Sequence, residues 1–156
     1  MNTTFADCTL LDTFTWFVKA RPNPDDKSFQ SQLGVHYEEV VESLDQLTGN
    51  AAAVPVIMDA RRALHKLAEL IKAQKADIKV LDEVLFLDSL CDQVVTGTGT
   101  AYTRGYDFIA AMVEVNRSNF SKFDAQGNPI HNEHGKVMKG ENYSPAELSP
   151  YIRKPE

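Results

Sequence analysis

The sequence has few cysteines and no long apolar run, and each absence excludes a class of protein. Cys8 and Cys91 are too few for a disulfide framework. Each lies in an apolar stretch, where a free thiol behaves as a small hydrophobic residue, so we expect a reducing, cytoplasmic setting. No uninterrupted apolar run approaches the roughly 20 residues that span a bilayer, and Asp7 and Asp12 stand where a signal peptide has its basic start. We therefore expect a chain that is neither exported nor embedded in a membrane.

Positive charge is scarce as well. Lysine and arginine number 16 against 22 aspartates and glutamates, which leaves a net charge of -6. Neutralising a run of phosphates requires a basic face, and the sequence shows none, so we do not expect a nucleic acid polymer as a partner. A small phosphorylated ligand then requires metal ions as the source of positive charge. The Gly-x-x-x-x-Gly-Lys-Ser/Thr spacing of a phosphate-binding loop is also missing.

What is present is the pattern of an all-α protein. Apolar residues recur at helical spacing in five segments, at about 5–19, 28–47, 55–75, 80–100 and 106–119. Ser28 is placed to cap the second segment, and Gly49 with Asn50 ends it. The fourth segment is apolar around most of its circumference, which is typical of a helix at the centre of a bundle.

Past Lys122 the composition shifts toward glycine and proline, which favours turns over helix. The stretch 124–156 therefore predicts a turn-rich tail with one short hairpin. A chain of 156 residues, 43% of them hydrophobic, has enough apolar surface for one core. We expect a single all-α domain over 1–156, a helical bundle of about five helices with its helical core over about 5–122 and its tail over about 123–156.

Acidic residues gather on the second predicted helix. Glu38, Glu42 and Asp45 line one edge of it, and Glu39 lies one turn before Glu42. Like charges at this spacing repel one another. A solvated acidic face is the common explanation for such a cluster, and cation binding is the other.

The fourth predicted helix favours cation binding. Asp88 and Asp92 are one turn apart and share the helix-wheel directions of apolar residues, so we expect them to point toward the core. Unpaired carboxylates in a low dielectric cost on the order of several kcal/mol, and this helix has no lysine or arginine. Two Mg²⁺ ions held between Glu39 and Glu42 on one helix and these aspartates on the other would satisfy the charges. Buried acids hydrogen-bonded to tyrosine or serine are the alternative.

Polar and basic residues follow on the fifth predicted helix and in the tail. Asn116 and Asn119 fall on the inward face of this helix, with Lys122 one turn further on, so their side chains are candidates to contact a base or a phosphate. Buried amides that satisfy backbone groups are the alternative. Lys136 and Lys139 lie next to glycines and are candidates for a lid over a triphosphate.

Four blocks of residues occur in a fixed order: Glu38-Glu39-x-x-Glu42, Asp88-x-x-x-Asp92, Asn116-Arg117-Ser118-Asn119 with Lys122, and Gly135-Lys136 with Lys139-Gly140. Together they resemble the all-α nucleoside triphosphate pyrophosphohydrolase superfamily, that is, the MazG-like and phosphoribosyl-ATP pyrophosphohydrolase-like proteins, and particularly its small phage and bacterial members. The resemblance covers roughly 29–151. It implies a helical bundle, usually a dimer or tetramer, whose acids bind Mg²⁺ and which releases pyrophosphate from a nucleotide.

The resemblance also implies roles for single residues. The implied metal ligands are Glu39, Glu42 and Asp92. Glu38 is implied to be a further ligand or the catalytic group that orients and deprotonates the attacking water. The usual second motif is Glu-x-x-Asp, which places a glutamate where this chain has Ser89, so Asp88 would substitute for it from a different angle.

In the same comparison Asn119 and Lys122 match residues that contact nucleotide, and Lys136 and Lys139 match the family tail. We therefore expect an enzyme that uses Mg²⁺, or Mn²⁺ in its place, to cleave nucleoside or deoxynucleoside triphosphates to the monophosphate and pyrophosphate. The same fold acting on dUTP, phosphoribosyl-ATP or an alarmone is one alternative. A helical interaction or scaffold protein with no catalysis is the other.

The first predicted helix carries large apolar residues on more than one face, namely Phe14, Trp16, Phe17 and Val18. A second apolar surface of this kind favours association with another copy of the chain. Since most soluble oligomers are symmetric assemblies of identical chains, we expect a homodimer or a dimer of dimers.

Overall fold

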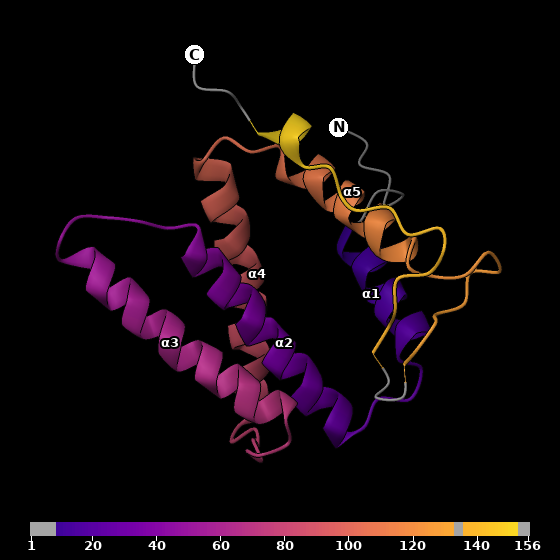
Figure 1. Ribbon diagram of the computed structural model, residues 1–156, viewed down its shortest axis with the longest axis horizontal. Helices are drawn as coiled ribbons and strands as arrows, with labels where there is room; N and C mark the ends of the chain where they lie inside the picture. Colours follow the sequence, from indigo (N-terminus) through magenta and orange to yellow (C-terminus); the bar gives the residue numbers. More distant parts are fainter. Residues whose placement is uncertain (1–8, 133–135, 153–156) are drawn as a thin grey trace. The chain divides into compact units, whose positions relative to one another are not determined.

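The computed structural model describes residues 9–132 and 136–152 (Figure 1). These residues contain no strand, and their helices are α1 (Thr9–Ala20), α2 (Asp26–Asp45), α3 (Ala53–Lys72), α4 (Glu83–Thr103), α5 (Phe108–Phe120) and the short 3-10 helix η2 (Ser149–Tyr151). The prediction of an all-α fold built from five α-helices is confirmed. The predicted ends agree within three residues, except that the first helix was expected to begin at Phe5, which lies outside the described residues. None of the described helices combines the length and apolar character needed to cross a bilayer.

Short polar side chains begin two of the helices. Asp25 caps α2, because its Oδ1 accepts hydrogen bonds from the backbone N of Ser28 at 2.8 Å and from Ser28 Oγ at 2.7 Å. The expected cap, Ser28, is therefore a donor to the true cap three residues earlier. Asp107 caps α5 in the same way, by accepting from the backbone N of Ala110 at 3.2 Å.

The chain divides into two compact units, and each is described by itself. The helix-pair unit, residues 23–82, contains α2 and α3, which lie side by side as an antiparallel pair (Figure 1). Its buried residues are Leu33, Gly34, Val41, Ala68 and Ile71. The two helices lie close together at Gly34, where an added Cβ would lie 3.3 Å from the carbonyl oxygen of Ala68. A residue without a side chain therefore allows the two helices to lie this close together.

The tail unit comprises residues 1–22 and 83–156, and within it α1 lies along α5 (Figure 1). Thr13 Oγ1 donates to Asn116 Oδ1 at 2.9 Å, and Asn116 Nδ2 donates to the carbonyl oxygen of Thr9 at 2.8 Å. Trp16 Nε1 donates to the carbonyl oxygen of Asn119 at 2.9 Å. Polar contacts thus fix the register of the two helices along their shared face.

The tail itself returns to α5. His131 and Val137 form one antiparallel bridge, so the predicted short hairpin is present as a single pair of bridged residues. Gly135, which lies between these two residues in the sequence, is outside the described residues. The backbone N of Gly140 then donates to the carbonyl oxygen of Lys122 at 3.3 Å. An added Cβ at Gly140 would lie 3.1 Å from that same oxygen, so glycine permits the tail to lie against the end of α5.

Helix α4 is the least covered element of the tail unit. Val84, Leu87 and Val94 are 76%, 62% and 53% exposed, and the buried residue of this helix is Ala101 near its C-terminal end. The prediction of a helix buried at the centre of a bundle is therefore wrong for the unit to which α4 belongs. An apolar circumference shows that a helix needs cover, but it does not show which element supplies the cover.

Candidate functional site

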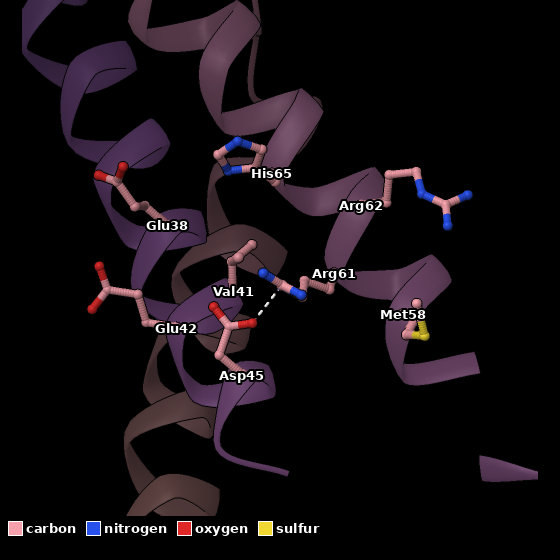
Figure 2. A pocket seen from close by; sticks show the side chains of 8 residues that line it. All are labelled: Glu38, Val41, Glu42, Asp45, Met58, Arg61, Arg62 and His65. Atoms are coloured by element: carbon pink, nitrogen blue, oxygen red, sulfur yellow. Dashed lines mark ion pairs between the residues drawn. The ribbon is translucent and has the colours of Figure 1, made fainter. Parts of the chain in front are cut away.

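A cleft of 390 Å³ lies between α2 and α3 in the helix-pair unit, and we call it the α2–α3 cleft. Figure 2 shows the residues that line it, which are Glu38, Val41, Glu42 and Asp45 from α2 and Met58, Arg61, Arg62 and His65 from α3. Its volume falls in the range of about 300–1,000 Å³ that is typical of small-molecule sites. Acidic side chains come from one helix and basic side chains from the other, so the cleft presents both signs of charge.

Two ion pairs join the walls of the cleft. Arg61 Nε contacts Asp45 Oδ1 (Figure 2), and Lys72 Nζ donates to both carboxylate oxygens of Glu38 at 2.8 Å. All four side chains are partly exposed, so each pair contributes roughly 0–1 kcal/mol to stability. Their main effect is positional, because a carboxylate that accepts two hydrogen bonds from one ammonium is held in one orientation.

Glu42 differs from the other two acids of the cleft. Within the described part of the chain its carboxylate has no hydrogen-bonding or ionic partner, whereas Glu38 and Asp45 are paired. The residue is exposed, as is its neighbour Glu39. The oxygens of Glu42 are therefore open to a cation from solvent.

Carboxylate oxygens are the ligands that Mg²⁺ prefers, so the acids of α2 fit a magnesium site in kind. They do not complete one alone, because the described residues of the helix-pair unit contain no group of three or more histidine, cysteine or acidic side chains that could hold a metal ion. The predicted site also requires Asp88 and Asp92, which belong to the tail unit.

Asp88 and Asp92 are both exposed on α4, and neither carboxylate has a partner in the ranges that the structure describes. The expectation that they point into a core is therefore wrong within this unit, and the cost of desolvation inferred from the sequence does not act on them here. Ser89 occupies the position at which the Glu-x-x-Asp motif has its glutamate, and its Oγ donates to the carbonyl oxygen of Leu85 at 2.9 Å. The hydroxyl of Ser89 is thus used within the helix.

Asn116 and Asn119 lie in different surroundings. Asn116 is 4% exposed, and both ends of its amide are engaged with α1 through Thr13 and Thr9. The structure therefore shows the alternative weighed for this residue, a buried amide that satisfies another helix. Asn119 is only half-buried, and its Oδ1 accepts from Lys122 Nζ at 2.8 Å.

Lys122 also lies over an aromatic ring. Its Nζ is 5.7 Å from the centre of the Trp16 ring, and this ring stacks at 5.9 Å on Phe123. The structure therefore brings Asn119 and Lys122, two predicted nucleotide contacts, together with an aromatic side chain from α1. Trp16 was expected only as part of an apolar surface, and no spacing along the chain connects it to α5.

Lys136 and Lys139 are exposed on the tail. Lys139 Nζ lies 4.5 Å from the centre of the Tyr143 ring, a distance at which a cation is attracted by an aromatic face. Because the backbone N of Gly140 donates a hydrogen bond to the carbonyl oxygen of Lys122, the neighbouring residue Lys139 lies near the C-terminal end of α5. The tail thus places Lys139 close in sequence to the point where the tail contacts Lys122.

A second contact of the tail involves Glu114 and Arg117. Arg117 Nε and Nη2 each donate to the Glu114 carboxylate at 2.7 Å, and the backbone N of Glu147 donates to the same carboxylate at 2.9 Å. The hydrogen bonds from Arg117, followed by that from Glu147, lower the pKa of Glu114 from 4.5 to about 2. This ionised pair fastens the end of the tail to α5.

Sequence reasoning missed the basic wall of the α2–α3 cleft. Arg61 and Arg62 were expected on the solvent side of the third helix, and His65 was not singled out. Met58, Arg61 or Arg62, and His65 recur at spacings of three and four residues, so they share one face of α3. Only the packing of α3 against α2 shows that this face meets acidic residues.

Comparison with protein-family models, with curated proteins and with solved structures found no match to this chain.

Proposed function

We propose that the chain is a Mg²⁺-dependent nucleotide pyrophosphohydrolase of the MazG-like type, which cleaves nucleoside or deoxynucleoside triphosphates to the monophosphate and pyrophosphate. The observation that carries this proposal is the α2–α3 cleft, where the open carboxylate of Glu42 lies on the wall opposite Arg61, Arg62 and His65. A polyphosphate with its metal ions presents both signs of charge, and a cleft with both signs on its walls complements it.

Glu39, Glu42, Asp88 and Asp92 are the residues that would hold Mg²⁺, or Mn²⁺ in its place. When bound, the metal neutralises charge on the phosphates and makes a bound water more acidic. Glu39 and Glu42 belong to the helix-pair unit, and Asp88 and Asp92 belong to the tail unit. A role for both helices is therefore part of the proposal.

Glu38 is the proposed catalytic base. The water oxygen forms a bond to the α-phosphorus, the bond from this phosphorus to the oxygen bridging to the β-phosphate breaks, and the proton of the water passes to Glu38. The two hydrogen bonds from Lys72 support this role, since they hold the carboxylate in one orientation. Lys72 is thus a positioning residue in this scheme.

The remaining predicted residues bind and position the nucleotide. Asn119 and Lys122 would contact it beside Trp16, and Lys136 and Lys139 would steady the terminal phosphates from the tail. Asn116 would act through α1, because its amide holds Thr13 and Thr9. The order of the four motif blocks in the sequence supports the same assignment.

A panel of nucleoside triphosphates incubated with Mg²⁺, scored for monophosphate and pyrophosphate, tests the proposal. We expect turnover of at least one substrate, including dUTP, phosphoribosyl-ATP or an alarmone within the panel, and a loss of more than about 100-fold in kcat for Glu42→Gln. Asp12→Asn is the matched control, since Asp12 is an exposed acid of α1. Absence of turnover across the panel contradicts the proposal.

An interaction or scaffold protein is the second candidate function, and one observation favours it. Helix α1 exposes Leu10, Leu11, Phe14 and Val18 at 53% or more. Phe14 and Val18 are two of the four residues from which a homodimer was expected, whereas the other two, Trp16 and Phe17, are half-buried. Exposed apolar patches of this kind mark sites of association. A scaffold predicts stability that does not respond to Mg²⁺, whereas the enzyme predicts that Mg²⁺ stabilises it.

A further inference from the structure

We propose that α4 pairs in antiparallel orientation with α4 of a second copy of the chain, around a two-fold axis at Cys91. The residues that carry this proposal form what we call the α4 stripe, which is Val84, Leu87, Cys91, Val94 and Thr98. They follow one another at spacings of three, four, three and four residues. This alternation is the pattern of helices that pack against one partner helix along a single seam.

The α4 stripe is open to a partner. Its apolar members are all exposed, and Val95 and Tyr102, at 67% and 81% exposed, border it on the same side of the helix. Each such side chain offers on the order of 100 Å² of apolar area, so the six together approach the about 800 Å² that each partner contributes to a stable interface. This area is at the upper end of the about 300–600 Å² that the largest apolar patch on a typical monomer covers.

The occupant that fits best is a second copy, because the stripe is nearly symmetric about its middle residue. Val84 and Thr98 each lie seven residues from Cys91. In an antiparallel pair Cys91 meets its own counterpart, and Val84 of each copy faces Thr98 of the other. A two-fold interface requires a patch that is complementary to itself. The α4 stripe has this property, because its two ends face each other when two copies of α4 pair in opposite directions.

Charge selects the antiparallel orientation. Asp88 borders the stripe one turn after Val84. In a parallel pair Asp88, on one flank of the stripe, would lie beside Glu83 of the other copy, which is on the opposite flank and five residues earlier, and the two like charges would repel. In the antiparallel pair the two aspartates are six residues apart along the axis, about 9 Å, and each lies beside an apolar residue of the other copy. Asp88 then remains at the edge of the seam and Asp92 lies outside it, so both stay open to the metal proposed above.

Sedimentation of the full chain at micromolar concentration tests the interface without any assay of activity, so its outcome is independent of the proposed function. We expect a dimer for the wild type and at least a tenfold weaker association for Val94→Glu. Leu85→Glu is the matched control, since Leu85 is 64% exposed on α4 but lies off the stripe. Circular dichroism checks that each variant keeps its helices.

Cross-linking tests the orientation. In a Cys8→Ser background Cys91 is the remaining thiol, and a short bis-maleimide should join two chains through it. With Cys91→Ala added, Val84→Cys alone should give no cross-linked dimer, whereas Val84→Cys combined with Thr98→Cys should give one.

Three results overturn the proposal. They are a monomer at micromolar concentration, efficient cross-linking through Val84→Cys alone, and a dimer that survives Val94→Glu but dissociates with Phe14→Glu. The first leaves the stripe to another part of the same chain, the second indicates a parallel pair, and the third assigns the interface to α1.

Discussion

Gly34 of α2 lies directly against Lys72 of α3, so that a Cβ at position 34 would come within 2.6 Å of Lys72 Cγ. The same lysine donates two hydrogen bonds at 2.8 Å to Glu38, one turn after Gly34 on α2. The absence of a side chain at position 34 therefore lets the stem of Lys72 cross α2 and reach the proposed catalytic base. The packing of Lys72 against Gly34 thus helps to position the carboxylate of Glu38.

Gly34→Ala should accordingly lower activity more than stability. Alanine favours a helix by roughly 1 kcal/mol over glycine. This gain offsets two costs: Lys72 moves aside and gives up a surface ion pair worth roughly 0–1 kcal/mol, and the helices shift slightly to make room between the new Cβ and the carbonyl oxygen of Ala68. We expect the free energy of unfolding to stay within about 1 kcal/mol of the wild type, while kcat for pyrophosphate release falls roughly 10-fold to 100-fold. Thermal unfolding and steady-state kinetics measure the two effects.

Two further variants separate the effect of displacing the Lys72 ammonium from the effect of added volume at position 34. Lys72→Met keeps the apolar stem and removes the ammonium, so it should reproduce the kinetic loss of Gly34→Ala. Gly34→Val adds bulk next to the backbone oxygen of Ala68 and should lower the free energy of unfolding by roughly 1–3 kcal/mol. Wild-type kcat in both Gly34→Ala and Lys72→Met contradicts the positioning role of the lysine.

Asn116→Ala should destabilise the contact of α1 with α5. The Thr13 hydroxyl and the Thr9 carbonyl oxygen are part-buried and lose their partner on α5, but they keep the hydrogen bond from Thr13 Oγ1 to Thr9 O at 3.0 Å. The loss should therefore be near the net value of a hydrogen bond, roughly 0.5–1.5 kcal/mol. Urea unfolding measures this loss, and combining Asn116→Ala with Thr13→Val should cost less than the sum of the two single changes. Unchanged stability with a raised KM would instead assign the amide to the substrate.

Lowering the pH should release the end of the tail, near Glu147, from α5. Because the pKa of Glu114 is lowered in the folded protein to about 2, the stabilisation from its ionised form is complete above pH 4.5 and is lost as the pH falls toward about 2. Limited digestion with pepsin across this range should cut near Glu147 faster at the lower pH. Circular dichroism confirms that the helices persist.

Glu114→Gln is the control for this pH dependence. It removes the charge but keeps the shape, so cleavage near Glu147 should be fast at every pH in the range. Equal cleavage of the wild type at pH 4.5 and at about 2 is inconsistent with a tail fastened by this carboxylate.

Trp16 should report nucleotide binding. It is the single tryptophan of the chain, and the ammonium of Lys122 lies 5.7 Å from the centre of its ring. A nucleotide that engages Lys122 draws this cation away, so the intrinsic fluorescence should change on titration. Lys122→Met should raise the Kd by about 10-fold to 100-fold, since a charge-assisted contact is worth roughly 1.5–3 kcal/mol, whereas Lys19→Met should not. A titration curve that Lys122→Met leaves unchanged contradicts the contact.

The helices could be predicted from the sequence because their signals are local. Apolar spacing places α2 and α3 within three residues of their observed ends, and the glycines and prolines after Lys122 indicate the turn-rich tail. The cap of α2 was assigned to Ser28 rather than Asp25 because both residue types cap helices and one turn separates them.

The candidate site could be predicted only in part, because its walls depend on packing between helices. The acids of the cleft were found from their cluster on α2. Arg61 and His65 gave no such signal, since only the packing of α3 against α2 brings their face toward those acids. For Asp88 and Asp92 the sequence predicted burial, and their exposure on α4 shows that composition does not determine which element covers a helix.

The central proposal is that acids of α2 and acids of α4 are ligands of Mg²⁺, and thermal unfolding with and without Mg²⁺ tests it most directly. At a concentration of 100 Kd the metal should stabilise the wild type by about 2.7 kcal/mol, which raises Tm by roughly 5–10 °C for a chain of this length. Asp12→Asn should keep the shift, whereas Glu42→Gln and Asp92→Asn should each abolish it. The account is contradicted if Mg²⁺ leaves the Tm of the wild type unchanged, or if Glu42→Gln and Asp92→Asn both keep the full increase in Tm.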